Sequence, residues 1–368
     1  MESFAFWYKE RSADDKASAD QDAPSEVSAV MNFNLWCGCG WEHKKILSKV
    51  PKEKHPFLDI GFKITHLDSA EELYFFLPLR IDEKNKKEYI EDLGRKFKDT
   101  SLVDAVFNEN YQTTISADSK TIDVHGQREK EEDSFKIYQL DIEHDISLSH
   151  FDTGTILTIK TDKIIYRREA TDKNDTYYFR FRVKGIPMDF LIHKYSPPHF
   201  VLQSLFHTTC MVDFRYHNIR SLENSLIEKF YEKSHHIVHV ESLHFLLMTK
   251  AYMDVSSNSF NSVRKIEYQV WRDYVNGHDT KDLVAYHFSD KAKVVSSNQE
   301  GEKTADSQNR SKKNFIESSE LFAKFSIERS VIFWYVLITI FLGVVGSILG
   351  SWIFEFLKSF WVQMGAGI

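Results

Sequence analysis

The feature that most constrains this chain is a run of apolar residues near its C-terminus. Residues 331–354, VIFWYVLITIFLGVVGSILGSWIF, contain no ionisable acid or base, although 27% of the 368 residues are charged. A helix needs roughly 20 apolar residues to cross a hydrocarbon core of about 30 Å. The sequence therefore predicts a single transmembrane helix over residues 330–354 and a short tail over 355–368. The alternative is a buried core helix, which rarely stays uncharged over such a length.

Aromatic residues at both ends of this run favour the membrane. Trp334 and Trp352 are separated by eighteen positions, which is about 27 Å along a helix. Amphipathic rings gather at the depth of the lipid headgroups. We therefore expect the interfacial residues to be Trp334, Tyr335, Trp352 and Trp361.

The distribution of basic residues gives the expected orientation. Several precede the run, and only Lys358 follows it; those that precede it are Arg310, Lys312, Lys313, Lys324 and Arg329. Positive flanks stay on the cytoplasmic side. The N-terminal sequence MESFAFWYKERSADDK lacks the apolar core of a signal peptide, and three cysteines do not form a secreted disulfide framework. These features predict a tail-anchored, single-pass membrane protein with a cytoplasmic body.

A stripe of small residues follows one side of the predicted helix. Its members are Thr339, Gly343, Gly346, Ser347, Gly350 and Ser351. In lipid, helices associate through close packing of small residues, and the spacing of Gly346 and Gly350 is typical of such contacts. The stripe predicts a homo-oligomer. The alternative is that glycine is simply frequent in membrane helices.

Patterns of period two dominate the predicted body, residues 31–295. Leu58, Ile60, Phe62 and Ile64 alternate with polar residues and glycine, as in a half-buried strand. Helical periodicity is clearer over residues 86–107 and 220–233. The expected fold class is α+β, led by antiparallel sheet, with a subdivision near 187–198, where prolines interrupt regular structure.

Three segments flank this body. Residues 1–30 combine an aromatic tip, read as a docking peptide or an added strand, with a flexible polar tract. Residues 296–313 lack bulky apolar side chains and predict a flexible linker with a reach of about 25 Å. Residues 314–329 predict an amphipathic juxtamembrane helix, with Leu321, Phe322 and Phe325 on one side, packed in a bundle or lying on the headgroups.

The best indication of a ligand is the stretch YYFRFRVKG. Alternation along a strand places four of its side chains on one face, and Arg168 on a preceding strand joins them; the four are Tyr178, Arg180, Arg182 and Lys184. Neighbouring cations repel one another unless an anion lies nearby, so this face predicts an anionic ligand or an acidic partner. The alternative is a solvated face neutralised by Asp172, Asp175 or a neighbouring strand.

Metal and cofactor signals are weak. The stretch CGCGWEH supplies four potential ligands, Cys37, Cys39, Glu42 and His43, but not the spacing of a zinc site. Strand alternation separates His239 and Glu241 from His236 and His244, so at most a pair converges. Glycine-rich phosphate loops are absent from the sequence. We expect no metal and no cofactor.

These observations predict a membrane protein whose body senses an anionic small molecule or a protein partner and couples binding to self-association of the membrane helix. Bacterial stress and antiviral effectors share such an architecture, by analogy only. A net charge of -7 argues against duplex nucleic acid as a partner. The alternatives are an enzyme at the membrane surface acting on a phosphate-bearing substrate, and a membrane-anchored scaffold; catalysis is the less expected.

Overall fold

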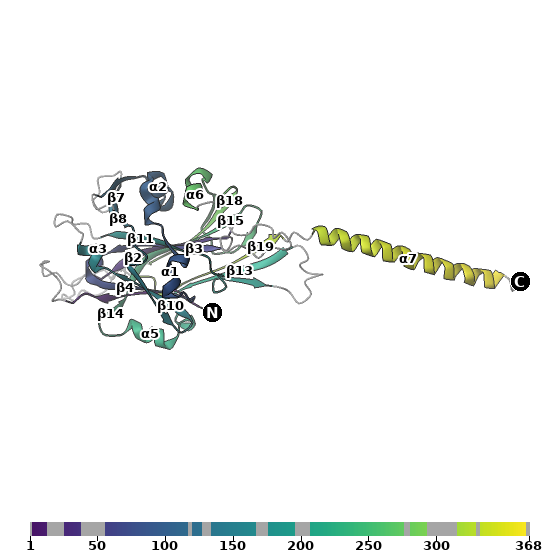
Figure 1. The fold of residues 1–368 in the computed structure, drawn as a ribbon, viewed down its shortest axis with the longest axis horizontal. Helices are drawn as coiled ribbons and strands as arrows, with labels where there is room; N and C mark the ends of the chain where they lie inside the picture. Colours follow the sequence, from purple (N-terminus) through teal and green to yellow (C-terminus); the bar gives the residue numbers. More distant parts are fainter. Residues whose placement is uncertain are drawn as a thin grey trace, which may run out of the picture.

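The computed structural model describes residues 2–12, 26–37, 56–116, 120–126, 134–166, 176–195, 207–275, 280–292, 315–328 and 332–365. Three β-sheets form a body, and one long helix extends away from it (Figure 1). Most strand pairs are antiparallel. The expected α+β class, rich in antiparallel sheet and followed by one apolar C-terminal helix, is confirmed.

The largest sheet has ten strands and lies at the centre of the body. Its order is β17 (Ser262–Lys265), β18 (Leu283–Lys291), β15 (His239–Lys250), β2 (Ser28–Trp36), β3 (Phe57–Thr65), β11 (Tyr177–Val183), β8 (Phe135–Tyr138), β7 (Thr121–Gly126) and β6 (Tyr111–Ile115), with β5 (Ile90–Asp92) also paired to β11. The pairs β15–β2 and β11–β8 are parallel. Strands far apart in the sequence therefore meet at its middle.

Two smaller sheets complete the body. The five-stranded sheet has the order β14 (His235–Ile237), β1 (Ala5–Glu10), β4 (Ala70–Leu77), β10 (Gly154–Lys160) and β9 (Ile146–Phe151). The four-stranded sheet has the order β12 (Ile192–Tyr195), β13 (His207–Tyr216), β19 (Ser319–Glu328) and β16 (Asp254–Ser256).

Both smaller sheets pack against the same face of the central sheet. The ring centroids of Phe6 and Phe62 are 5.1 Å apart, and those of Phe33 and Phe214 are 4.8 Å apart. Aromatic pairs at such distances add to the free energy gained by burying their area. This face of the central sheet is therefore the main hydrophobic core.

Short helices cover other surfaces. They are α1 (Lys86–Tyr89), α2 (Thr100–Phe107), α3 (Asp162–Tyr166), α5 (Asn224–Phe230) and α6 (Tyr268–Tyr274). α5 lies where helical periodicity predicts it, with Leu226 and Phe230 buried. The predicted helix over residues 86–107 is divided, because residues 90–92 form β5 on the edge of β11. The opposite face of the central sheet is covered by α2 and α6, which bring Phe107 against Tyr178 and Trp271 against Trp36.

The aromatic N-terminal tip is part of the folded body. β1 lies between β14 and β4, and Phe4, Phe6 and Trp7 are buried. Of the two alternatives for the tip, the structure shows the added strand. Residues 13–25 of the polar tract lie outside the described residues.

The predicted juxtamembrane helix over residues 314–329 is wrong. This segment forms β19, hydrogen-bonded between β13 and β16. Leu321, Ala323 and Phe325 are buried, whereas Phe322 and Lys324 are exposed, so the burial alternates with the period of a strand. The predicted linker over 296–313 lies outside the described residues, but the chain that follows it returns to the body before the apolar helix.

The apolar C-terminal helix is α7 (Ile332–Gly365), so the helix continues beyond the predicted boundary at residue 354. Its apolar span, Tyr335–Ser359, is 25 residues long, which is about 37 Å and enough to cross a membrane. None of its most apolar window is buried against the body. The alternative of a core helix is therefore not what the structure shows.

Candidate functional site

Arg180 and Arg182 lie at the centre of the body rather than on a solvated face. β11, which carries them, is hydrogen-bonded to β3 on one side and to β8 and β5 on the other. Arg180 is 0% exposed and Arg182 is 3% exposed, because α2 and α6 cover this face of the sheet. The sequence correctly places both side chains on one face, but the expectation of a solvated face is wrong.

A single carboxylate, Asp59 of β3, pairs with Arg182 in a bidentate arrangement. Arg182 Nε donates to Asp59 Oδ1 at 2.6 Å, and Nη2 donates to Oδ2 at 3.1 Å. Trp36 Nε1 and the Tyr274 hydroxyl each donate to Oδ2 at 2.8 Å. Burial alone would lower the pKa of Arg182, but the charge and hydrogen bonds of Asp59 outweigh burial and raise it. Asp59 and Arg182 thus neutralise each other.

Arg180 has a different environment, because its direct partners are neutral. Its Nε donates to the Tyr274 hydroxyl at 2.7 Å, and Nη1 donates to the Tyr178 hydroxyl at 2.8 Å. With the Asn34 amide oriented to match, Nη2 donates to Asn34 Oδ1 at 2.7 Å. Asp59 Oδ2 is 3.9 Å from Arg180 Nη2.

The buried cluster therefore carries an excess positive charge. Burial raises the pKa of both Tyr178 and Tyr274, so their phenols are neutral at neutral pH and compensate no charge. A guanidinium keeps its proton in proteins. Two guanidinium groups and one carboxylate leave one net positive charge among side chains that are almost fully buried. Such a charge is costly unless an anion or strong dipoles compensate it.

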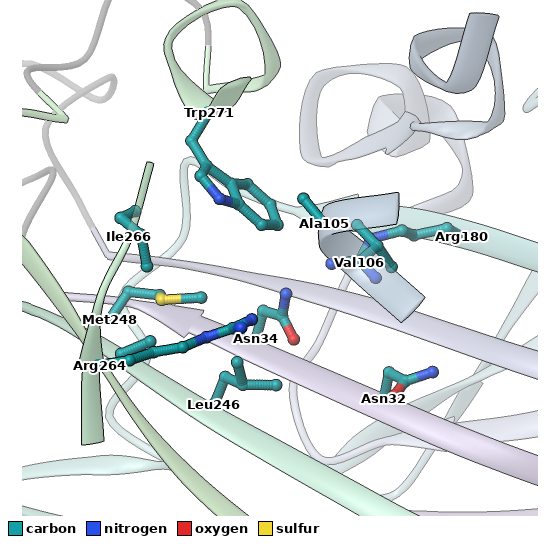
Figure 2. A pocket seen from close by; sticks show the side chains of 11 residues that line it. Asn32, Asn34, Ala105, Val106, Arg180, Leu246, Met248, Arg264, Ile266 and Trp271 are labelled. Atoms are coloured by element: carbon teal, nitrogen blue, oxygen red, sulfur yellow. The ribbon is translucent and has the colours of Figure 1, made fainter. Parts of the chain in front are cut away.

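A narrow pocket opens directly onto Arg180. It is a small cavity of about 20 Å³ between the central sheet and the helices α2 and α6 (Figure 2). Its lining comprises Asn32, Asn34, Ala105, Val106, Arg180, Leu246, Met248, Arg264, Ile266, Trp271 and Ala285. Most ligand pockets combine an apolar lining with a few polar groups that fix orientation, as this one does.

Polar groups from three directions converge on this pocket. Arg264 of the edge strand β17 reaches toward Asn34 (Figure 2), and its Nη1 donates to Asn108 Oδ1 at 3.1 Å. Trp271 is 3% exposed, and its buried Nε1 has no hydrogen-bond partner among the described residues. Buried donors are normally satisfied, so an unpaired one needs an explanation. Together Arg180 and Arg264 bring two cationic groups to the pocket lining, which suits an oxyanion.

The remaining described residues of the predicted ligand face do not line the pocket. The ammonium of Lys184 donates to Glu91 Oε2 at 2.5 Å. The Tyr178 ring lies over Gly61, where a Cβ atom would collide with its hydroxyl, so this position requires glycine. Arg168, Asp172 and Asp175 lie outside the described residues. The neutralising acids on this face come from neighbouring strands, as one alternative expected.

The residues considered for metal binding are dispersed. Cys37 is buried and reduced, and Cys39, Glu42 and His43 lie outside the described residues. His239 pairs with Glu26, and His244 Nδ1 lies 3.1 Å from His287 Nε2. Within the described part of the chain, no group of three or more His, Cys, Asp or Glu side chains is arranged to hold a metal ion.

The small residues of α7 make no contact with the body. A Cβ atom at Gly343, Gly346 or Gly350 would meet nothing within 4 Å. Thr339 Oγ1 donates to the Tyr335 carbonyl at 2.8 Å, and Ser351 Oγ donates to the Ser347 carbonyl at 3.0 Å. Tyr335, Trp352 and Trp361 are exposed, and the side chain of Trp334 lies outside the described residues. The stripe is therefore available for contact with another helix.

Sequence reasoning missed most of the pocket. Asp59, Trp36 and Tyr274 complete the ion cluster, and Arg264 and Trp271 complete the lining. One signal was present, because Asp59 is an acid within the apolar run of β3 and lies opposite Arg182 in the sheet register. No comparable pattern in the sequence indicates that α6 covers the two arginines.

Comparisons with known proteins give no relative for this chain. No family model matches it, and neither the curated proteins nor the solved structures contain a match.

Proposed function

We propose that this protein is a single-pass membrane sensor that binds an anion in the Arg180 pocket and couples binding to self-association of α7. The basic residues that precede α7 favour a cytoplasmic location for the body. A helix that is long, apolar and exposed on all sides favours insertion of α7 into a bilayer. Because the protein has both a pocket and an apolar helix, we propose that ligand binding in the pocket controls assembly through the helix.

The observation that carries this proposal is the buried excess charge beside an open pocket. Arg180 lies at the base of the pocket, Arg264 lies at its rim, and the Trp271 indole supplies an unpaired donor. An oxyanion bound there would compensate the charge of Arg180. A carboxylate or a phosphate group suits these donors, and a cavity of about 20 Å³ favours a small anionic group over a bulky organic ligand.

A set of contacts joins the pocket to β19, the strand that precedes α7 in the chain. Strand β15 contributes Leu246 and Met248 to the pocket on one face and Phe245 to the core on the other. The ring of Phe245 lies 4.7 Å from that of Phe214 on β13, and Phe214 is directly opposite Leu321 on β19. β19 ends at Glu328, and α7 begins at Ile332. Movement of β15 on ligand binding would therefore reach α7 through packed side chains.

Self-association would use the small-residue stripe of α7. Helix packing in lipid depends on close approach of backbones, and the glycine positions have nothing of their own chain in the way. Because three residues separate β19 from α7, a change in the arrangement of the bodies would act directly on the packing of the helices.

The pocket composition favours binding over catalysis. The lining named above includes no His, Asp or Glu, which are the usual general acids and bases. An enzyme acting on a phosphate-bearing substrate would need such a group within reach of the arginines. We therefore prefer the sensor to the membrane-surface enzyme and to the scaffold.

Thermal unfolding of the full-length protein in detergent tests the binding step. Inorganic phosphate and acetate are the probes, each compared with chloride at equal ionic strength. We expect at least one probe to raise the Tm by roughly 2–4 °C, as a ligand specific for the folded state does. Arg264→Gln should abolish the rise, because it removes a pocket cation whose side chain is exposed.

Lys265→Gln is the matched control. Lys265 follows Arg264 on β17, so its side chain leaves the opposite face of the strand, where it pairs with Asp282. Loss of the same charge there should leave the Tm rise intact. Equal Tm values in chloride, phosphate and acetate for the wild-type protein would refute an oxyanion site, and equal rises in both variants would place binding elsewhere.

A further inference from the structure

The end of the four-stranded sheet must lie close to the start of α7. β19 ends at Glu328 and α7 begins at Ile332, so three residues connect them. A fully extended chain covers at most about 3.6 Å per residue, which limits the distance between Glu328 and Ile332 to roughly 14 Å. Figure 1 shows this sheet at the side of the body from which α7 departs. If α7 crosses a bilayer, this end of the sheet faces the headgroups.

Two exposed tyrosines flank β19 at this end. Tyr195 of β12 pairs with Thr209, Thr209 pairs with Ser326, and Ser326 pairs with Asp254, so all four lie in one row across the sheet. β16 runs antiparallel to β19, and Tyr252, which precedes β16 by two residues, therefore lies beside the end of β19. Tyr195 is 49% exposed and Tyr252 is 53% exposed.

The chemistry of this surface suits lipid headgroups. Tyrosine has an apolar ring and a polar hydroxyl, a combination enriched where membrane meets water. Basic residues accompany the tyrosines: Lys194 is next to Tyr195, and Lys250 contacts the carbonyl of Lys281 beside Tyr252. Among the acids there, Asp282 is paired with Lys265, and Asp254 is exposed. Lysines near a membrane surface are attracted to anionic lipids.

We propose that Tyr195 and Tyr252 rest in the headgroup layer around α7, so that the body docks on the bilayer through the end of the four-stranded sheet. This inference depends on the membrane placement of α7 proposed above. It gives the body one fixed orientation on the membrane, with the chain passing from β19 into α7 between the two tyrosines.

Site-specific fluorescence in vesicles tests this docking. The full-length protein is reconstituted in vesicles of phosphatidylcholine and phosphatidylserine, in a Cys39→Ser background, because Cys37 and Cys210 are buried. Tyr195→Cys and Tyr252→Cys provide positions for an environment-sensitive dye. Tyr231→Cys is the matched control, because Tyr231 is 74% exposed after α5, on the five-stranded sheet. Leu342→Cys, within α7, reports insertion of the helix.

Nitroxide lipids labelled in the headgroup or in the acyl chain serve as quenchers. We expect headgroup nitroxides to remove most of the fluorescence at positions 195 and 252 and to leave position 231 unaffected, while acyl-chain nitroxides quench position 342. Quenching at 342 with none at 195 and 252 would overturn the docking but leave the membrane anchor in place. A blue-shifted but unquenched dye at 195 and 252 would show that a second copy of the chain covers this end, which also overturns the docking. Absence of quenching at 342 would overturn both proposals.

Discussion

Phe245 and Phe214 pack ring against ring across the core, with their centroids 4.7 Å apart. Phe245 belongs to the strand that lines the Arg180 pocket, and Phe214 belongs to the strand that pairs with β19 along its full length. This contact therefore joins a pocket strand to the strand beside β19, as the Phe33–Phe214 contact also does. Core interfaces of this kind change between discrete packings rather than deform continuously.

This contact leads to a prediction about coupling. Phe214→Leu should destabilise the body by about 1–2 kcal/mol, because it removes aromatic contacts but keeps an apolar side chain of similar volume. It should retain the phosphate- or acetate-dependent rise in Tm while losing any anion-dependent change in oligomer mass. Mass measurement in detergent micelles checks this result, with Phe151→Leu on the five-stranded sheet as the control. A Phe214→Leu protein that still changed mass with the anion would contradict transmission through this contact.

The buried ion pair yields a prediction about stability. Asp59→Asn leaves two guanidinium groups without a carboxylate and should lower the free energy of unfolding by roughly 3–5 kcal/mol, as measured by urea denaturation in detergent. The double variant Asp59→Asn with Arg182→Met should lose less than the sum of the two single variants, because it also removes the uncompensated cation.

Asp282→Asn serves as the control for this series, because Asp282 and Lys265 form an exposed pair. Its effect should stay below about 1 kcal/mol, as for surface ion pairs in general. If Asp59→Asn also lowered the free energy of unfolding by less than about 1 kcal/mol, Asp59 would not be the charge partner of the arginines.

His217 makes the stability of the body depend on pH. Its Nε2 accepts a hydrogen bond from the Phe6 amide at 3.0 Å, and burial lowers the pKa of His217 to about 4, below the ordinary value of 6.5. The neutral form is therefore favoured in the folded state. The stability that neutral His217 contributes is fully present above pH 6.5 and is lost as the pH falls toward 4. This contribution to the free energy of unfolding is roughly 3 kcal/mol.

Denaturation at several pH values checks this dependence. His217→Asn should flatten the fall in stability between pH 6.5 and 4, and asparagine tolerates the positive φ of 50° at this position. His150→Asn, which alters an exposed histidine paired with Asp82, should leave the slope unchanged. Equal slopes in the wild-type and His217→Asn proteins would contradict the assignment.

The glycine stripe predicts how α7 associates. Gly346→Leu should weaken self-association by about tenfold or more, because it prevents close approach of two helix backbones. Val345→Leu adds bulk to the opposite side of the helix and should have little effect. Analytical ultracentrifugation in detergent separates the two variants. A monomeric wild-type protein at all concentrations would remove the assembly step from the proposed function.

Hydrophobic periodicity in the sequence correctly predicted elements that bury one side against a single neighbouring part of the body. Helix α5 formed where Leu222, Leu226 and Phe230 recur at four-residue steps, because each of these side chains is buried on one side. β19 was predicted as a helix because the spacing of Leu321 and Phe325 fits one face of a helix as well as one face of a strand. The strand forms because β13 and β16 supply hydrogen bonds on both of its edges, and neither partner is close in the sequence.

The candidate site was predicted only in part for a similar reason. Alternation along β11 correctly placed Tyr178, Arg180 and Arg182 on one side. Their surroundings come from residues that are distant in the chain, since Asp59 precedes Arg182 by 123 positions and Tyr274 follows Arg180 by 94. A strand pattern shows which side chains share a face but not what covers that face.

The placement of β19 also determines how the body would bear mechanical load. Ten residues of β19, from Ser319 to Glu328, pair with β13, and β16 holds the opposite edge. A pull exerted by α7 along the strand would stretch this whole ladder in shear, so that many hydrogen bonds would have to break together. Lateral movements of a membrane would thus shift the body as one unit before they detached the strand that holds it.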